Sequence, residues 1–144
     1  MDNIVEKAID QSSANAYGDT ERLKFVKEMQ AQGFVVLEPD EEELLIDCDT
    51  EEHFKMFLEQ LTILERNLGL EIPYKDWESR GGPPGKHISV LMPFQLTPEE
   101  RIAWQAALGS DPKRELLSLI RLRNGDALPT ILVEKPNFKG GEWI

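Results

Sequence analysis

The 144-residue chain has little cysteine, no long apolar run and few basic residues, and each shortage narrows what the protein can be. Cys48 is the sole cysteine, so no disulfide can form within the chain. The N-terminal residues also lack the basic and apolar regions of a signal peptide, which together with the free thiol predicts a cytoplasmic protein. No stretch approaches the roughly 20 apolar residues that span a bilayer, so we expect no membrane partner.

Basic side chains are outnumbered, because 16 Lys and Arg face 27 Asp and Glu and leave a formal charge of −11. Such a charge disfavours sequence-independent binding to a phosphate backbone. Several basic residues are nevertheless grouped between Arg80 and Arg123, and a metal site made of carboxylates needs local negative charge. The composition therefore argues against a general nucleic-acid binder but is compatible with a metal-dependent site.

Apolar spacing and turn residues predict an α+β fold, in which helices are packed on a mainly antiparallel sheet. The expected elements are a helix from Asp19 to Gly33, strands at 34–37 and 44–46 that form a hairpin or lie side by side, a helix at 50–68, a loop at 79–85, a strand at 87–93, a helix at 97–108, a strand or short helix at 116–122 and a strand at 130–133. The order expected for the whole domain is α-β-β-α-β-β-α-β-β, which counts one further strand between the helices at 50–68 and 97–108. We expect an N-terminal helix and linker at 1–18, one domain at 19–136 and a tail at 137–144.

Two aspartates separated by one residue follow the apolar run at 44–46. Side chains alternate along a strand, so Asp47 and Asp49 are expected on one side and Cys48 on the other. Two ionised carboxylates at that spacing repel each other, which favours a bound cation or strong hydrogen bonding. The alternative is that they only end the strand and cap the helix that begins at Thr50. His53, in the first turn of that helix, is expected to be exposed or part of the cap.

Two further stretches carry polar residues that suit a site. His87 directly follows the Gly- and Pro-rich loop at 79–85, whose backbone N–H groups could hold a phosphate; alternatively the loop is a plain hairpin turn and the histidine is structural. Asp111 follows a predicted helix end and precedes Lys113 and Arg114; alternatively it belongs to a turn that caps the next element.

Taken in order, these stretches resemble the catalytic core of the archaeo-eukaryotic primase superfamily, especially the short primase-polymerase domains of phages and plasmids. The hydrophobic-Asp-hydrophobic-Asp motif of that family is similar to residues 46–49, its small-x-His motif to 85–87, and its third acidic residue to Asp111, with Glu134 as a competing choice. The resemblance covers about residues 44–136. Two departures are Arg123–Asn124, where Leu-Pro is usual, and the lack of enough Cys and His for a four-ligand zinc module.

The resemblance implies an α+β primase-polymerase core that transfers nucleotides to a DNA primer during phage or plasmid DNA replication. It implies Mg²⁺ or Mn²⁺ held by Asp47, Asp49 and Asp111 as catalytic acids, or with Glu134 as the third metal ligand. The implied nucleotide-binding residues are Ser79, Arg80, Lys86, His87, Arg121 and Arg123, and Arg114 is a further candidate for phosphate or template contacts. The implied partners are nucleoside triphosphates, a single-stranded or primed DNA template and a replicative helicase.

Two alternatives remain open on the sequence. One is a catalytically silent, primase-like accessory or interaction module in replication, which the small size and the charge of −11 favour. The other is a metal-dependent nuclease, because an acid pair with a histidine also suits phosphodiester hydrolysis.

Overall fold

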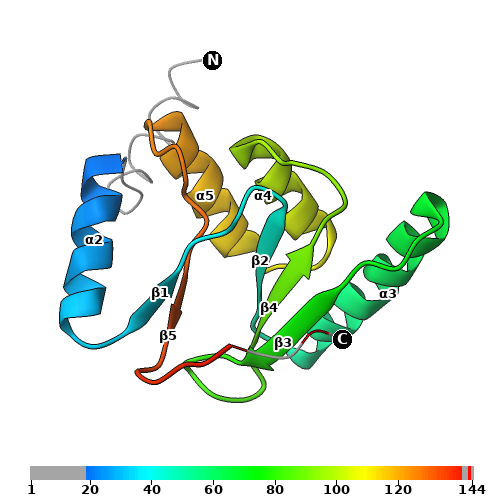
Figure 1. Cartoon of the computed structure of the whole chain (residues 1–144), viewed down its shortest axis with the longest axis horizontal. Coiled ribbons are helices and arrows are strands. Elements are labelled where there is room, and N and C mark those ends of the chain that lie inside the picture. Colours follow the sequence, from blue (N-terminus) through cyan, green and yellow to red (C-terminus); the bar gives the residue numbers. More distant parts are fainter. Residues whose placement is uncertain (1–18, 141–142, 144) are drawn as a thin grey trace.

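Helices and strands alternate through the part of the chain that the computed structural model describes, residues 19–140 and 143. The helix and linker expected at 1–18 lie outside these residues. The described elements are α2 (Asp19–Ala31), β1 (Val35–Leu37), β2 (Glu43–Cys48), α3 (Glu51–Leu68), β3 (Tyr74–Glu78), β4 (Lys86–Leu91), α4 (Pro98–Ala107), α5 (Pro112–Arg123) and β5 (Leu132–Glu134). The predicted α+β class is confirmed, with four helices and two small antiparallel sheets in the described residues (Figure 1).

The larger sheet has the order β2-β4-β3, and both of its strand pairs are antiparallel. The register places Asp47 of β2 and Trp77 of β3 on either side of His87 in β4. Directly opposed residues project from the same face of a sheet, so these three side chains share one face. The smaller sheet pairs β1 with β5, with Val35 opposite Glu134.

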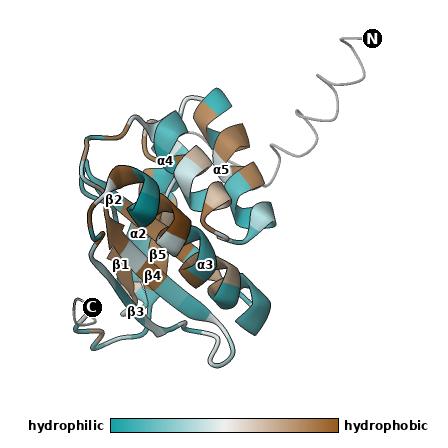
Figure 2. Ribbon diagram, turned by 90° about the vertical axis from the view of Figure 1, so that its right-hand side faces the viewer, coloured by the Kyte–Doolittle hydropathy of each residue, from teal (hydrophilic) through white to brown (hydrophobic). Residues whose placement is uncertain are grey.

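Helix α3 covers the other face of the larger sheet. Its N-cap is Thr50, whose hydroxyl accepts the backbone N–H of His53 at 3.1 Å, so the expected cap is confirmed. Its C-terminus is closed by Gly69, which has the left-handed φ of 70° that glycine tolerates best. The apolar side of α3 is buried against β2 and β4, in a core that includes Leu44, Ile46, Cys48, Phe57, Leu61, Ile88 and Val90. Figure 2 shows hydrophobic residues along several strands, whereas β3 (YKDWE) is hydrophilic.

The β1–β5 ribbon lies against the face of the sheet that α3 leaves uncovered. Glu134 of β5 accepts hydrogen bonds from the Trp77 indole and from His87. Leu45 and Ser89 also project from this face, and both are fully buried. The ribbon and sheet therefore enclose polar side chains between them.

The hairpin expected between the first two strands is wrong, because β1 pairs with β5 and β2 pairs with β4. The connection between them is held by α4 instead. Arg101 is 4% exposed, and its guanidinium donates to the carbonyl oxygens of Asp40 and Glu43 at 2.8 and 2.9 Å. These contacts attach the connection between the two strands to α4.

Residues 116–122, expected as a strand or a short helix and placed as a strand in the element order, belong to helix α5. Asp111 is the N-cap and accepts the Lys113 N–H, and Pro112 occupies the first turn, where its missing N–H costs nothing. Arg121 and Arg123 lie in the last turn, where cations favour a helix. No helix in the described part of the chain is long and apolar enough to cross a membrane.

Replacing Phe57 by alanine should destabilise the protein by about 3–5 kcal/mol. The ring is fully buried, edge-on to Tyr74 at 5.3 Å between centroids, and its loss would leave a cavity between α3 and the sheet. The free energy of unfolding from urea denaturation measures the effect. Met56→Ala, one residue earlier and 48% exposed, is the control and should cost less than about 1 kcal/mol. Equal losses in the two variants would contradict this account of the core.

Candidate functional site

Within the described residues no strand pairs with the outer edge of β2, and helices α4 and α5 and the link between them supply hydrogen-bond partners for it. The Leu45 N–H donates to the Gln105 side-chain oxygen at 3.0 Å, and the Leu45 carbonyl accepts from Arg114 at 2.6 Å. The Asp47 N–H donates to the Ser110 hydroxyl at 3.1 Å. Because buried backbone groups without partners are costly, these contacts tie the link between α4 and α5 to the strand.

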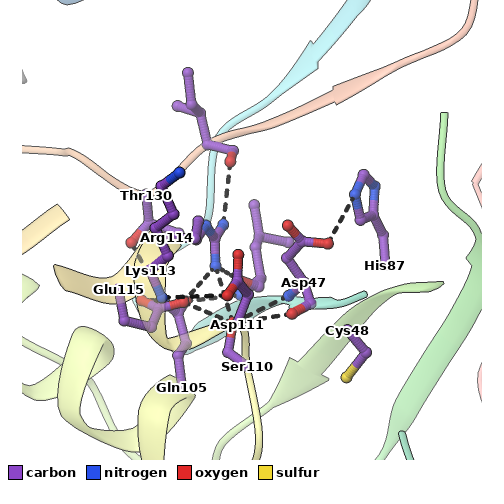
Figure 3. Close-up of polar contacts among 12 residues, drawn as sticks. Asp47, Cys48, His87, Gln105, Ser110, Asp111, Lys113, Arg114, Glu115 and Thr130 are labelled. Carbon is purple, nitrogen blue, oxygen red and sulfur yellow. Dashed lines mark hydrogen bonds and ion pairs between the residues drawn. The ribbon is translucent and has the colours of Figure 1, made fainter. Parts of the chain in front are cut away.

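This attachment brings the third aspartate to the other two. The Asp111 N–H donates to the Asp47 carbonyl at 2.7 Å, as a neighbouring strand would. One carboxylate oxygen from each of Asp47, Asp49 and Asp111 lies within 4.8 Å of the others. Figure 3 shows Asp111 beside Asp47, with Cys48 directed away from both. The three carboxylates implied as metal ligands therefore converge, and Asp111 is supplied by the N-cap of helix α5, as the alternative of a cap for the next element expected.

The three carboxylates have different electrostatic surroundings. Burial raises the pKa of Asp47, but the hydrogen bond and charge of His87, with the charge of Arg114, outweigh it and hold the pKa below its usual value. Asp49 is exposed, yet burial of part of its carboxyl group and the charges of Asp47 and Asp111 raise its pKa. A divalent cation bound among the three carboxylates would relieve the like-charge repulsion that Asp49 experiences.

His87 is only 8% exposed and both ring nitrogens face carboxylates, Nδ1 towards Glu134 and Nε2 towards Asp47 at 3.4 Å. Burial lowers its pKa, but the hydrogen bonds to Asp47 and Glu134 more than compensate and raise it to about 9. The imidazole is therefore protonated at neutral pH and donates from both nitrogens. His87 is thus buried, with both ring nitrogens facing carboxylates, which does not favour the hydrogen bond to phosphate implied for it. Its part in nucleotide binding stays a prediction.

Glu134, the competing third acid, is not part of the carboxylate cluster. It is 1% exposed and accepts from the Trp77 Nε1 at 2.9 Å as well as from His87. The group that could hold a metal ion among the described residues consists of Asp47, Asp49 and Asp111. Glu134 thus supports the histidine, and its assignment as a metal ligand is not supported by its position.

A pocket of about 320 Å³ opens next to the carboxylates. Its lining includes Asp47, Asp49, Ser79, Arg80, His87 and Arg114. The loop that carries Ser79 and Arg80 is closed by the Ser79 N–H, which donates to the Gly85 carbonyl at 2.9 Å. A Cβ atom at position 85 would lie 2.4 Å from the Ser79 hydroxyl, which explains why a residue without a side chain precedes Lys86 and His87.

Three of the expected nucleotide-binding residues lie away from this pocket. Lys86 adjoins His87 in β4 and projects from the opposite face, where it pairs with Asp76 at 3.3 Å and lies over the Phe54 ring. Arg121 and Arg123 are in the last turn of α5. At 1.5 Å per residue, they lie roughly 15–18 Å along the helix from its N-cap at Asp111. Arg114, one turn from the N-cap, is the helix cation that lines the pocket.

The donor set suits a hard divalent cation. Carboxylate oxygens are the ligands that Mg²⁺ and Mn²⁺ prefer, and the cluster holds no thiolate or imidazole ligand that would favour zinc. The pKa of the neighbouring Cys48 thiol is raised to about 12, chiefly by burial, and its side chain lies on the core face. The residues present therefore fit the expected Mg²⁺ or Mn²⁺.

No family model, curated protein or solved structure matches the chain. Its chemistry must therefore be argued from the site itself.

Asparagine at positions 47 and 49 should have opposite effects on stability in a chelating buffer near pH 7.5. Asp49→Asn removes a repelled charge and should stabilise by a few tenths of a kcal/mol, because solvent screens an exposed group. Asp47→Asn removes the charge paired with His87 and Arg114 and should destabilise by about 1–2 kcal/mol. Urea denaturation of both variants measures the difference. A loss of stability in Asp49→Asn equal to that in Asp47→Asn would contradict these electrostatics.

The stability of the metal-free protein should fall as the pH rises from 6.5 to 9. The pKa of His87 is raised from 6.5 to about 9 in the folded chain, so its stabilising charge is complete below pH 6.5 and lost as the pH passes 9. The slope should approach about 1.4 kcal/mol per pH unit within this range. His87→Gln should be less stable overall but should lack this slope. Parallel pH profiles for the two proteins would show that another group titrates.

Proposed function

We propose that this chain is a metal-dependent nucleotidyltransferase of the primase-polymerase type. Its substrates would be nucleoside triphosphates and a primed or single-stranded DNA template, in phage or plasmid replication beside a helicase. The observation that carries the proposal is the convergence of Asp47, Asp49 and Asp111 within 4.8 Å, next to a pocket that offers Ser79 and Arg80. The order of the motifs in the sequence supports the same assignment.

In the proposed reaction, the primer 3′-oxygen forms a bond to the α-phosphorus of the incoming nucleotide. The bond to the β-phosphate breaks, pyrophosphate leaves, and the hydroxyl proton passes to water. Mg²⁺ or Mn²⁺, when bound, supplies stabilisation of the charge on the attacking and leaving oxygens. Asp47, Asp49 and Asp111 hold and orient the metal, and the pKa of Asp47, which is lowered, keeps that ligand ionised at neutral pH.

The residues around the pocket divide the remaining tasks. Arg80 is exposed at the rim, where its guanidinium lies over the Phe34 ring at 5.0 Å from the centroid. In this proposal the N–H groups of that guanidinium bind the triphosphate, with the Ser79 hydroxyl beside them. Arg114 is bound to the carbonyl oxygens of Leu45 and Ile131, which makes it a fixed positive charge below the site. In this proposal His87 positions Asp47, with Glu134 holding the ring from behind.

A primed-template assay tests the proposal directly. A labelled primer annealed to a longer template, with deoxy- or ribonucleotides and Mn²⁺, should be extended by the wild-type protein. Asp111→Asn should reduce extension at least about 100-fold while keeping the fold, because asparagine also caps helices well. Asp40→Asn, an exposed change of the same kind outside the pocket, is the matched control and should leave extension unaltered.

The same assay separates the rivals. Shortening of the primer or template instead of extension would identify a nuclease. If the primer is unchanged but titration calorimetry detects Mn²⁺ binding, the protein is a catalytically silent module. The formal charge of −11 also favours that alternative. If the protein neither extends the primer nor binds Mn²⁺, there is no basis for assigning metal-dependent chemistry to these carboxylates.

A further inference from the structure

We propose that Glu115 is a positioning residue for the metal site. It lies below the carboxylates, in the first turn of α5, and would set the distance between Asp47 and Asp111 through Gln105, Ser110 and Arg114. This inference rests on the proposed function, since it assigns Glu115 a part in metal binding at that same site.

Glu115 is a buried carboxylate surrounded by donors. It is 3% exposed, and its Oε2 accepts from the Ser110 hydroxyl at 2.6 Å and from Arg114 Nη1 at 2.8 Å. Its Oε1 accepts from Gln105 Nε2 at 2.9 Å. Figure 3 shows these side chains gathered behind Asp111. Isolated carboxylates are rarely buried, and here three donors, one of them a guanidinium, compensate for the desolvation of Glu115.

Each donor that contacts Glu115 also contacts the free edge of β2. Gln105 accepts from the Leu45 N–H, Arg114 donates to the Leu45 carbonyl, and Ser110 accepts from the Asp47 N–H. One carboxylate therefore orients all three side chains that hold the strand carrying Asp47. Two of the three come from the segment that carries Asp111, so the same contacts place both metal-binding aspartates.

A carboxylate is needed because this site requires acceptors alone. Glutamine has the same size, but its amide has a single acceptor oxygen and two N–H donors. At position 115 the amide would oppose either Gln105 or Arg114, both of which donate, and would leave the Arg114 charge without its partner. The expected consequence is a shift of Ser110 and Asp111 relative to Asp47, with little change of volume in the core.

Mn²⁺ binding by the full chain is the test. Glu115→Gln should raise the dissociation constant for Mn²⁺ about 10–100-fold, which is the usual cost of losing a group that orients metal ligands. The electron paramagnetic resonance spectrum of bound Mn²⁺ should also change, which a purely structural loss would not produce in the fraction that remains folded. Glu59→Gln, the same change at an exposed position of α3, is the control and should match wild type in both readouts.

Ser110→Ala provides a second variant if Glu115→Gln does not fold. It removes the hydroxyl between Glu115 and the Asp47 N–H but keeps the pairing of Glu115 with Arg114, and it should raise the dissociation constant in the same direction. If both single variants fold, the double variant should bind little worse than Glu115→Gln, since Glu115→Gln already disturbs the hydrogen bond through which Ser110 is oriented.

The outcomes distinguish the two proposals. The positioning role is overturned if a folded Glu115→Gln variant shows the Mn²⁺ affinity and spectrum of wild type. If Glu115→Gln does not fold, the same result in Ser110→Ala overturns it. Either result leaves the proposed metal site standing. A wild-type chain that binds no Mn²⁺ would overturn both the positioning role and the proposed function.

Discussion

The site depends on one constraint, the unpaired backbone edge of β2. A strand at the edge of a sheet must find partners for its N–H and C=O groups or be exposed to water. Here Gln105, Ser110, Arg114 and the Asp111 N–H take the place of a neighbouring strand. The junction of α4 and α5 is consequently held against β2 as a paired strand would be. Asp111 is brought to Asp47 by hydrogen bonds to the β2 backbone, which do not depend on the charge of the Asp111 carboxylate.

Charge is arranged around this edge in layers. The exposed side carries the repelling carboxylates of Asp47, Asp49 and Asp111. Behind them lie the cations His87 and Arg114, and behind those lie the buried carboxylates Glu134 and Glu115, each bound to one of the cations. Alternation of sign lets the chain keep charges in its interior, because each is compensated by a neighbour of opposite sign. A cation at the exposed carboxylates would extend the same alternation outward.

Local patterns were enough to predict much of this arrangement. The helix cap at Thr50 and the alternation of Asp47 and Cys48 could be inferred from neighbouring residues. The gathering of three aspartates was implied by the order of the motifs along the chain. The pairing of β1 with β5 could not be inferred from neighbouring residues, because it joins strands from opposite ends of the domain and leaves no local signal. Glu115 and Gln105 were missed since polar helix residues ordinarily face water. The direction of Lys86 away from the pocket could have been inferred, because a residue next to His87 in a strand must project from the other face.

Asp111 has two duties that meet in one side chain, since its carboxylate caps α5 by accepting the Lys113 N–H at 3.2 Å and also belongs to the acidic cluster. A cation bound by the Asp111 carboxylate would compete with the Lys113 N–H for its oxygens, or be oriented by that hydrogen bond. The start of α5 is therefore coupled to the occupancy of the site. Because the Lys113 N–H donates to the Asp111 carboxylate, the rate at which its proton exchanges with solvent should report whether the site is occupied. This measurement needs no substitution in the chain.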